Sequence, residues 1–291
     1  MKIIKYFFEF VLVIIFFLIF KIIGLKLSSD LGEIIGKYFG PLFRKKTIAK
    51  KNILIAFPDL NEKSINEMID RMWKNIGRIF GEYIHISKFS ITDERKKKIV
   101  FANKNNIEIL KKNNKPLVFF SGHFANFELM AKCLQELGFN IGAIYRPLNN
   151  IFLNPIMEFI RKKYICPIQI EKGSNGTKKL IKHISANNPL ALMIDQRLSS
   201  SIRVPFFNQL ATTTTTPAQF AIKYDALLVP VFLKRIEKTN FEFFIEDPLI
   251  IIKTNDYDKD IFNITKIMNK KIEEFIKRDP PHWLWSHNRW K

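Results

Sequence analysis

The feature that most constrains this chain is a nearly unbroken apolar run close to its N-terminus. Residues 10–20 read FVLVIIFFLIF, and the run resumes after Lys21. The window 3–25 is long enough to cross a bilayer as a helix, which takes about 20 residues. Lys5 and Lys21 lie near its ends, where their long side chains reach the headgroups, whereas Glu9 fits a span poorly. We therefore expect a membrane anchor here.

Two other interpretations of this run stay open. A cleaved signal peptide requires small residues at its cleavage site, and residues 21–31, KIIGLKLSSDL, lack that pattern. A helix buried in a soluble core would tolerate Glu9 and Lys21. We expect an uncleaved anchor over residues 1–27, followed by one domain over 28–291 that divides into a helical lead-in (28–115) and a core (116–291).

Charge predicts the topology and the partners of the chain. Two lysines precede the apolar run and six Lys or Arg residues follow it up to residue 46, so we expect a single-pass anchor with the domain in the cytoplasm. The chain carries 47 Lys+Arg against 27 Asp+Glu, a net charge of +20. Anionic membrane lipids are the expected partner, and no nucleic acid is expected because no nucleic-acid-binding motif occurs.

The cysteines and the periodicity limit the class of fold. Cys133 and Cys166 have neither disulfide-framework nor zinc-ligand spacing, so no metal site is expected. Up to about residue 114 the apolar spacing is helical, and from 116 short apolar runs such as LVFFS, LALMIDQ and ALLVPVFLKRI alternate with helical stretches. We expect an α/β fold with a mixed, largely parallel central sheet covered by helices, and a long helix over about 257–278.

The sharpest chemical pattern is SGHFANFE, residues 121–128, where a strand turns into a helix. His123 and Glu128 are five positions apart, about 140° around an ideal helix, so His123 must lie in the turn if the two side chains meet. The pair would then be a general base with an orienting carboxylate. An ordinary capped strand end is the alternative. Ser121 lacks the GxSxG nucleophile pattern, which favours direct transfer to a hydroxyl or to water.

Five segments along the chain resemble one family in order and spacing: GHFANFELMA, IYRPLNN, NPIMEFIRKKY, MIDQR and RVPFFNQLATTTTTPAQFAIKYDALLVPVF. They are similar to the late (lauroyl/myristoyl) acyltransferases of lipid A biosynthesis, in the lysophospholipid acyltransferase-like superfamily. The lead-in AKKNILIAFPDLNEKSINEMIDRMWKNIGRIFGEY and the terminal WLWSHNRWK also resemble this family. The resemblance covers nearly the whole chain, including the anchor.

The resemblance implies a glycerol-phosphate-acyltransferase-like fold and an enzyme of the bacterial inner membrane. A fatty acyl group would pass from acyl-acyl carrier protein to a hydroxyl on a 3-hydroxyacyl chain of a Kdo-bearing lipid A precursor. No metal or other cofactor is implied. By the same likeness His123 and Glu128 would be catalytic.

A larger set of residues is expected to contact substrate. Arg146 ends a strand at the edge where α/β ligands bind, and a structural ion pair is its alternative role. Arg197 departs from the acidic residue that family members often carry there. Thr214 belongs to a threonine run before Pro217 that capping partly explains. The expected substrate-binding residues are Asn126, Arg146, Asp195, Gln196, Arg197, Arg203 and Thr214.

Two further questions stay open at this stage. The motifs around His123 serve chemistry that is shared by acyltransferases of glycolipids, lysophospholipids and aminolipids, and a non-catalytic membrane-surface scaffold is a third possibility. The terminal Trp283, Trp285 and Trp290 suit either a membrane interface or packing beneath the sheet.

Overall fold

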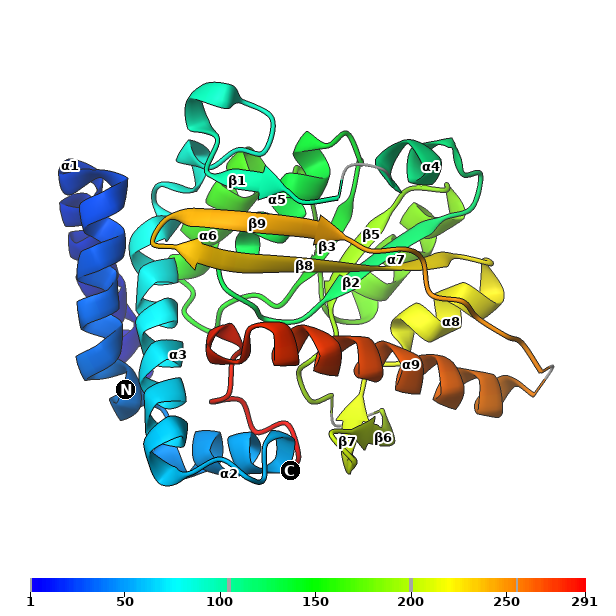
Figure 1. Cartoon of the computed structure of the whole chain (residues 1–291). Helices are drawn as coiled ribbons and strands as arrows, with labels where there is room; N and C mark the ends of the chain where they lie inside the picture. Colours follow the sequence, from blue (N-terminus) through cyan, green and yellow to red (C-terminus); the bar gives the residue numbers. More distant parts are fainter. Residues whose placement is uncertain (1, 104–105, 199–200, 255) are drawn as a thin grey trace.

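The strands of the computed structural model, which describes residues 2–103, 106–198, 201–254 and 256–291, form one large sheet and a small hairpin. The strands are β1 (Ile99–Phe101), β2 (Leu117–Ser121), β3 (Gly142–Tyr145), β4 (Ile168–Glu171), β5 (Leu190–Met193), β6 (Ile202–Phe206), β7 (Gln209–Thr213), β8 (Leu227–Glu237) and β9 (Asn240–Ile245). The large sheet has the order β1-β9-β8-β2-β5-β3-β4 (Figure 1). Only β8 and β9 pair antiparallel within it, so the expected mixed, largely parallel sheet is confirmed.

Helices cover both faces of this sheet. They are α1 (Lys2–Phe43), α2 (Lys46–Ala56), α3 (Glu62–Tyr83), α4 (Asn106–Lys112), α5 (Glu128–Glu136), α6 (Leu153–Tyr164), α7 (Ser174–Ser185), α8 (Thr216–Lys223) and α9 (Tyr257–Arg278), with short 3₁₀ turns at Ile86–Lys88, Glu94–Lys96 and Pro280–His282. The bounds of α9 confirm the helix expected over 257–278.

Strand β2 shows how the two faces of the sheet pack against two separate layers of helices. Val118 and Phe120 pack into a core shared with α7, α8 and α9, whereas Leu117 and Phe119 pack into a second core shared with α4, α5 and α6. Successive side chains of a strand point to opposite faces, so a strand covered on both faces is apolar throughout. The sequence LVFFS fits this position, and every one of its residues is buried.

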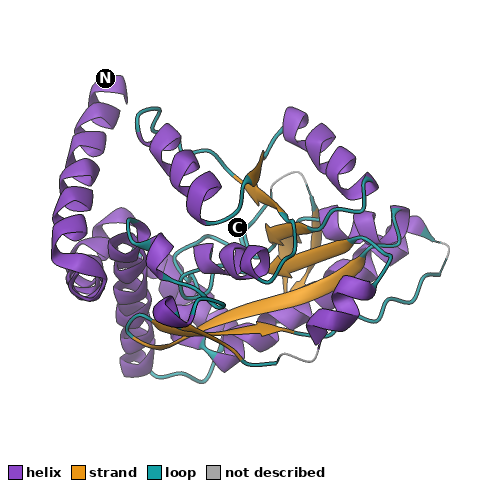
Figure 2. Cartoon of the chain, turned by 90° about the horizontal axis from the view of Figure 1, so that it is seen from above, coloured by secondary structure: helices purple, strands orange, loops and turns teal. Residues whose placement is uncertain are grey.

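Helix α1 consists of two halves that meet at Gly24. This glycine has φ 81° and ψ 170°, a backbone conformation that breaks the helix and that side chains with a Cβ rarely adopt. Figures 1 and 2 together show that the two halves run in different directions. The second half packs closely on α3, since a Cβ added at Gly32 would lie 2.3 Å from the carbonyl oxygen of Gly77.

Two short segments differ from the expected pattern, and the C-terminal tryptophans fit one of their two open interpretations. The lead-in contains a strand, β1, which pairs parallel with β9. Strands β6 and β7 form a separate antiparallel hairpin after β5. At the C-terminus Trp283 and Trp285 are 1% and 0% exposed, so they pack in the core as the second interpretation proposed and do not face a membrane.

Candidate active site

The adjacency of β2 and β5 brings His123 and Asp195 together. The two strands are parallel, with Ser121 opposite Met193 in the register. His123 and Asp195 each lie two residues beyond these partners, at the carboxyl edge where ligands of α/β sheets bind. The backbone N–H of Ile194 donates to the carbonyl of Ser121 at 2.9 Å, which extends the pairing one residue toward the site.

The Asp195 carboxylate is the partner of the His123 imidazole. Its Oδ1 lies 2.7 Å from His123 Nδ1, while its Oδ2 accepts from the backbone N–H of His123 at 2.7 Å and from Trp283 Nε1 at 2.8 Å. Asp195 is 3% exposed. Gly122 is required for this approach, because a Cβ there would lie 2.9 Å from Asp195 Oδ2. The carboxylate therefore holds both the ring and the backbone of His123.

This contact fixes the tautomer that a general base needs. A carboxylate at Nδ1 holds the ring proton there, which makes Nε2 the acceptor of the ring. Gln196 Nε2 lies 3.3 Å from His123 Nε2 and is placed to donate to it. The His123 side chain is 17% exposed, and the ring of Phe127 packs edge-on against it at 4.8 Å between centroids.

The charges of the pair stabilise each other. Burial disfavours the charged imidazole, but the charge and hydrogen bond of Asp195, with a smaller contribution from Glu128, outweigh burial and raise the pKa of His123. Burial likewise disfavours the Asp195 carboxylate, and the charge and hydrogen bonds of His123 overcome it and lower the pKa of Asp195 to about 2. An imidazolium formed here is therefore stabilised.

The expected contact between His123 and Glu128 is wrong. Glu128 begins α5, and its carboxylate accepts from Arg161 of α6, with the Nε of Arg161 3.2 Å from Oε1. The five-residue separation of Glu128 from His123 was compatible with a contact. In the structure, however, the ring of His123 turns toward Asp195, and the ring of Phe127 packs against the imidazole. Glu128 acts on His123 through its charge alone, without a hydrogen bond.

The turn that carries His123 is held in a strained conformation by long-range contacts. Ala125 has φ 45°, a value that costs free energy in any residue with a Cβ. Its N–H donates to the carbonyl of His282 at 3.0 Å, and its carbonyl accepts from Asn75 Nδ2 of α3 at 3.1 Å. These contacts offset the strain and fix the turn between α3 and the C-terminal segment.

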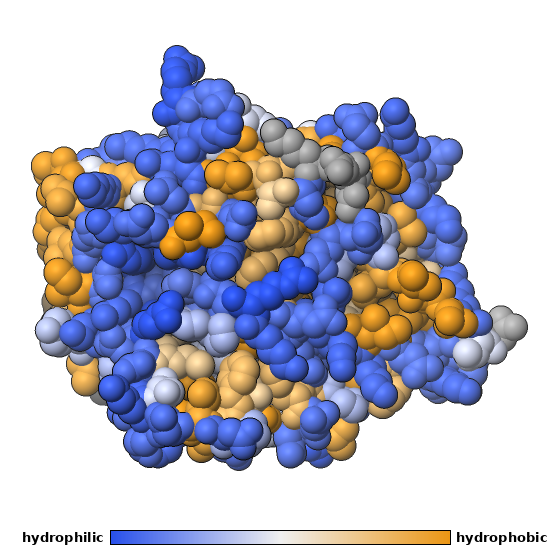
Figure 3. Space-filling view, in the orientation of Figure 1, coloured by the Kyte–Doolittle hydropathy of each residue, from blue (hydrophilic) through white to orange (hydrophobic). Residues whose placement is uncertain are grey.

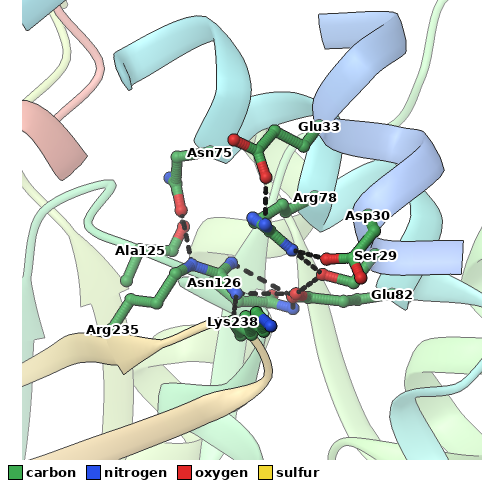
Figure 4. Close-up of polar contacts among 10 residues, drawn as sticks. All are labelled: Ser29, Asp30, Glu33, Asn75, Arg78, Glu82, Ala125, Asn126, Arg235 and Lys238. Carbon is green, nitrogen blue, oxygen red and sulfur yellow. Dashed lines mark hydrogen bonds and ion pairs between the residues drawn. The ribbon is translucent and has the colours of Figure 1, made fainter. Parts of the chain in front are cut away.

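Behind this turn lies a buried polar network centred on Glu82 of α3 (Figure 4). The Glu82 carboxylate, 0% exposed, accepts from Arg235 Nη1 of β8 at 2.6 Å, from Asn126 Nδ2 at 2.9 Å and from Ser29 Oγ of α1 at 2.8 Å. Arg235 Nε donates to Asn75 Oδ1 at 2.9 Å. The network therefore joins α1, α3 and β8 to the turn of the active site.

The remaining predicted substrate-binding residues lie in different places in the fold, and only some of them face solvent. Asn126, 1% exposed, points into the Glu82 network. Arg146 is exposed one residue beyond β3, and together with burial its charge lowers the pKa of Lys172. Gln196 is exposed beside the imidazole of His123.

The last three predicted residues belong to the part of the chain between the end of β5 and the start of α8. The backbone N–H of Arg197 donates to His287 Nε2 at 2.9 Å. Arg203 is exposed on β6, opposite Thr212 of β7. Thr214 Oγ1 accepts from the backbone N–H of Thr216 at 3.4 Å, a local turn contact just before α8, whose N-cap residue Thr215 makes no side-chain capping bond.

Sequence reasoning missed several residues that build this site. Trp283 was considered only as an aromatic, yet its indole N–H anchors Asp195. Arg161 was not singled out, although it pairs with Glu128, and neither Glu82 nor Arg235 was recognised as a buried ion pair. Arg161 lies in the quoted motif NPIMEFIRKKY, and its rarity among the many lysines was a usable signal. Among the described residues no group of three His, Cys, Asp or Glu side chains is arranged to hold a metal.

The shifted pKa of His123 predicts a pH dependence of any reaction that uses it as a base. Only the neutral imidazole accepts a proton, so activity should rise with pH through a midpoint above the ordinary value of 6.5. Asp195→Asn removes the largest stabilisation of the charged ring, so the midpoint of the residual activity should fall. Glu128→Gln should move it less. Profiles of kcat/KM against pH for the three proteins measure these midpoints, and a larger shift in Glu128→Gln would contradict the assignment.

Comparison with known proteins gives one consistent result. The family model described as bacterial lipid A biosynthesis acyltransferase matches residues 1–291. The chain is 25% identical over 268 residues to the lipid A biosynthesis palmitoleoyltransferase of Escherichia coli strain K12, covering 90% of this chain and 84% of that protein. Two lipid A biosynthesis acyltransferases of Haemophilus influenzae are 26% and 21% identical, covering 88% and 94% of this chain and 83% and 84% of theirs.

Proposed function

The chain belongs to the bacterial lipid A biosynthesis acyltransferase family, and from this premise we propose that it transfers a fatty acyl chain from acyl-acyl carrier protein to a hydroxyl of a 3-hydroxyacyl chain on a Kdo-bearing lipid A precursor. The observation that carries the proposal is the 2.7 Å contact between His123 Nδ1 and Asp195 Oδ1, which leaves Nε2 as the acceptor of the ring, beside the exposed Gln196. The relatives named above support the class of acceptor.

The proposed reaction is a direct transfer with His123 as general base. The imidazole Nε2 accepts the proton of the acceptor hydroxyl while the hydroxyl oxygen attacks the thioester carbonyl carbon. A new carbon–oxygen bond forms and the carbon–sulfur bond breaks, and the departing thiolate takes the proton back from the imidazolium. Atoms and charge balance without a covalent intermediate on the enzyme. Asp195 orients the ring and Glu128 stabilises its positive charge.

The proposed binding residues supply charge and hydrogen bonds around this base. Gln196 lies beside the reactive nitrogen, and Arg146 is exposed at the same edge of the sheet, where a guanidinium binds phosphate in a bidentate manner. Arg197 and Arg203 add positive charge after β5, and Thr214 lies just before α8. Asn126 holds the turn from behind.

We also propose that α1 anchors the enzyme in the bacterial inner membrane, with the catalytic domain on the cytoplasmic side. The helix is long and apolar enough to cross a membrane, with a mean hydropathy of 2.7 over its most apolar window. The net charge of +20 favours a surface of anionic lipids. The lipid acceptor then meets the site at the membrane surface.

Mass spectrometry of lipid products tests the proposed reaction. Membranes that contain the protein are incubated with mixed acyl carrier protein thioesters and a tetra-acylated Kdo-bearing acceptor, and a mass gain of one acyl chain is expected. The size of the gain identifies the preferred chain. If a control enzyme of the family acylates this acceptor and the protein does not, the acceptor is wrong, and product formed with lysophospholipids, glycolipids or aminolipids would identify its replacement.

A further inference from the structure

The first half of α1, residues 2–23, has one covered face and one free face. Its buried and half-buried positions keep to one half of the helix circumference. They are Tyr6, Glu9, Phe10, Val13, Ile14, Phe16, Phe17, Phe20 and Ile23. The positions between them are exposed and mostly apolar: Ile3, Ile4, Phe7, Phe8, Val11, Leu12, Ile15, Leu18, Ile19 and Ile22. This half therefore lies along the domain with its free apolar face turned outward.

The end of this half nearest Gly24 is packed on α3. The ring of Phe17 lies 5.8 Å from that of Phe80 and 6.3 Å from that of Tyr83, measured between centroids. Phe20 is fully buried, and its ring lies 5.3 Å from that of Phe80. These contacts belong to the same core that covers one face of the sheet.

The opposite end is held by the loop before α6. Phe152 packs on both Phe7 and Phe10 at 5.9 Å between ring centroids. Asn150 Nδ2 donates to the carbonyl of Tyr6 at 2.8 Å and to the Glu9 carboxylate at 3.2 Å. Figure 2 shows the N-terminal half rising beside this part of the domain. Glu9, which fits a span poorly, thus has a partner in the domain.

A helix held in this way at both ends conflicts with a crossing of the bilayer. Twenty-two residues extend about 33 Å, close to the thickness of about 30 Å of the hydrocarbon layer. If the helix crossed, the loop bound to Tyr6 and Glu9 would be carried into or across that layer together with the start of α6. Lys162 of α6 is 54% exposed in its side chain and forms an ion pair with Glu158, and such charged groups are costly in hydrocarbon.

We infer that the first half of α1 lies in the plane of the membrane, with its free apolar face in the hydrocarbon of one leaflet and its covered face on the domain. This inference rests on the membrane anchoring proposed above and replaces the crossing that the sequence predicts. Hydrophobic residues line the left edge of the molecule in Figure 3, where Figure 1 places α1. An amphipathic arrangement of this kind is typical of helices that lie at a membrane interface.

The lysines at both ends of this half fit the in-plane arrangement. Lys2 and Lys5 precede the apolar stretch, Lys21 and Lys26 follow it, and all four are exposed. In a crossing helix one pair would face the far side, against the preference of Lys for the cytoplasmic side. In the plane of one leaflet, both pairs reach the anionic headgroups of the same surface.

Labelling of single cysteines from each side of the membrane tests this inference. Lys2→Cys and Lys26→Cys flank the helix, Lys179→Cys on α7 reports the side of the domain, and the wild type serves as background control because Cys133 and Cys166 are buried. An impermeant maleimide should label all three variants in inverted inner-membrane vesicles and none in intact spheroplasts. Labelling of Lys2→Cys from the opposite side would overturn the inference. Absence of the protein from the membrane fraction would instead refute the anchoring itself.

The depth of spin labels in the membrane is a second test, which does not depend on whether a reagent reaches the ends of the helix. Ile4, Val11 and Leu18 are exposed and seven residues apart, so they lie on one side of the helix. Spin labels at these positions in the full-length protein in vesicles should have depths that agree within a few Å, estimated from the in-plane geometry. A crossing helix would place the label at Val11 about 10 Å deeper than the other two, which would overturn the inference.

Discussion

Replacement of His123 by Ala is expected to reduce kcat by about 10²–10⁴-fold while the protein stays folded. The side chain is a half-buried base whose Nδ1 is 2.7 Å from Asp195 and whose Nε2 lies 3.3 Å from the amide nitrogen of the exposed Gln196. His282 also has a carboxylate at Nδ1, that of Asp279 at 2.7 Å, but it lies in the 3₁₀ turn after α9 and not at the carboxyl edge of the sheet. His287 is turned toward the backbone of Arg197, and its pKa is lowered to about 4, mainly by burial. The loss should therefore appear in the chemical step, measured as acyl transfer per enzyme under saturating donor and acceptor.

The matched control for this variant is His183→Ala on α7. His183 is also partly buried, and its Nε2 contacts the backbone carbonyl of Pro189 at 3.0 Å, but it lies outside the candidate site. Its replacement should leave kcat within about twofold, because surface and near-surface changes away from a site have small effects. Thermal unfolding of both variants in detergent shows that each is folded. Full activity of His123→Ala would refute the proposed base and would favour a site elsewhere in the same fold.

Local patterns account for the parts of the fold that the sequence predicted. The apolar stretch of α1, the helical spacing of α9 and the doubly buried strand LVFFS each depend on residues close together in the chain. The placement of His123 in a turn followed from the boundary between a strand and a helix at SGHFANFE, and the family resemblance is confirmed over residues 1–291. Strand β1 was missed because three residues, Ile99–Phe101, are too short to show a period.

Asp195 could not be predicted as the partner of His123 from patterns of residues close together in the chain. His123 and Asp195 are 72 residues apart, and they meet because β5 inserts between β2 and β3. Chain order alone does not give that insertion, since β3 and β4 come between these strands in the sequence. Glu128 was the nearest acidic residue of the motif, so proximity in the chain was mistaken for proximity in space. The path of α1 along the domain depends on Asn150 and Phe152 in the same way.

Arg235→Met is expected to produce the largest loss of stability in this chain. It would leave the Glu82 carboxylate, which is 0% exposed, as an uncompensated buried charge next to the turn of the active site. Breaking a buried ion pair in this way costs about 3–5 kcal/mol, whereas replacing both partners by apolar residues costs much less. The double variant Glu82→Leu/Arg235→Met should therefore recover much of the loss. Unfolding in detergent, followed by intrinsic fluorescence against denaturant, measures both.

Comparing the single and the double variant also distinguishes two roles of the Glu82 network, which are to stabilise the fold and to fix the turn that carries His123. Asn126 and Ser29 donate to Glu82, so the double variant removes their acceptor even where it restores the packing of the core. We expect its kcat to stay reduced while its KM and its stability approach those of the wild type. Glu62→Gln, which breaks the exposed pair of Glu62 with Lys50, is the control and should leave stability and kcat unchanged. A double variant that recovered full activity would show that the buried pair contributes to stability alone, and that the contacts of Ala125 with Asn75 and His282 suffice to hold the turn.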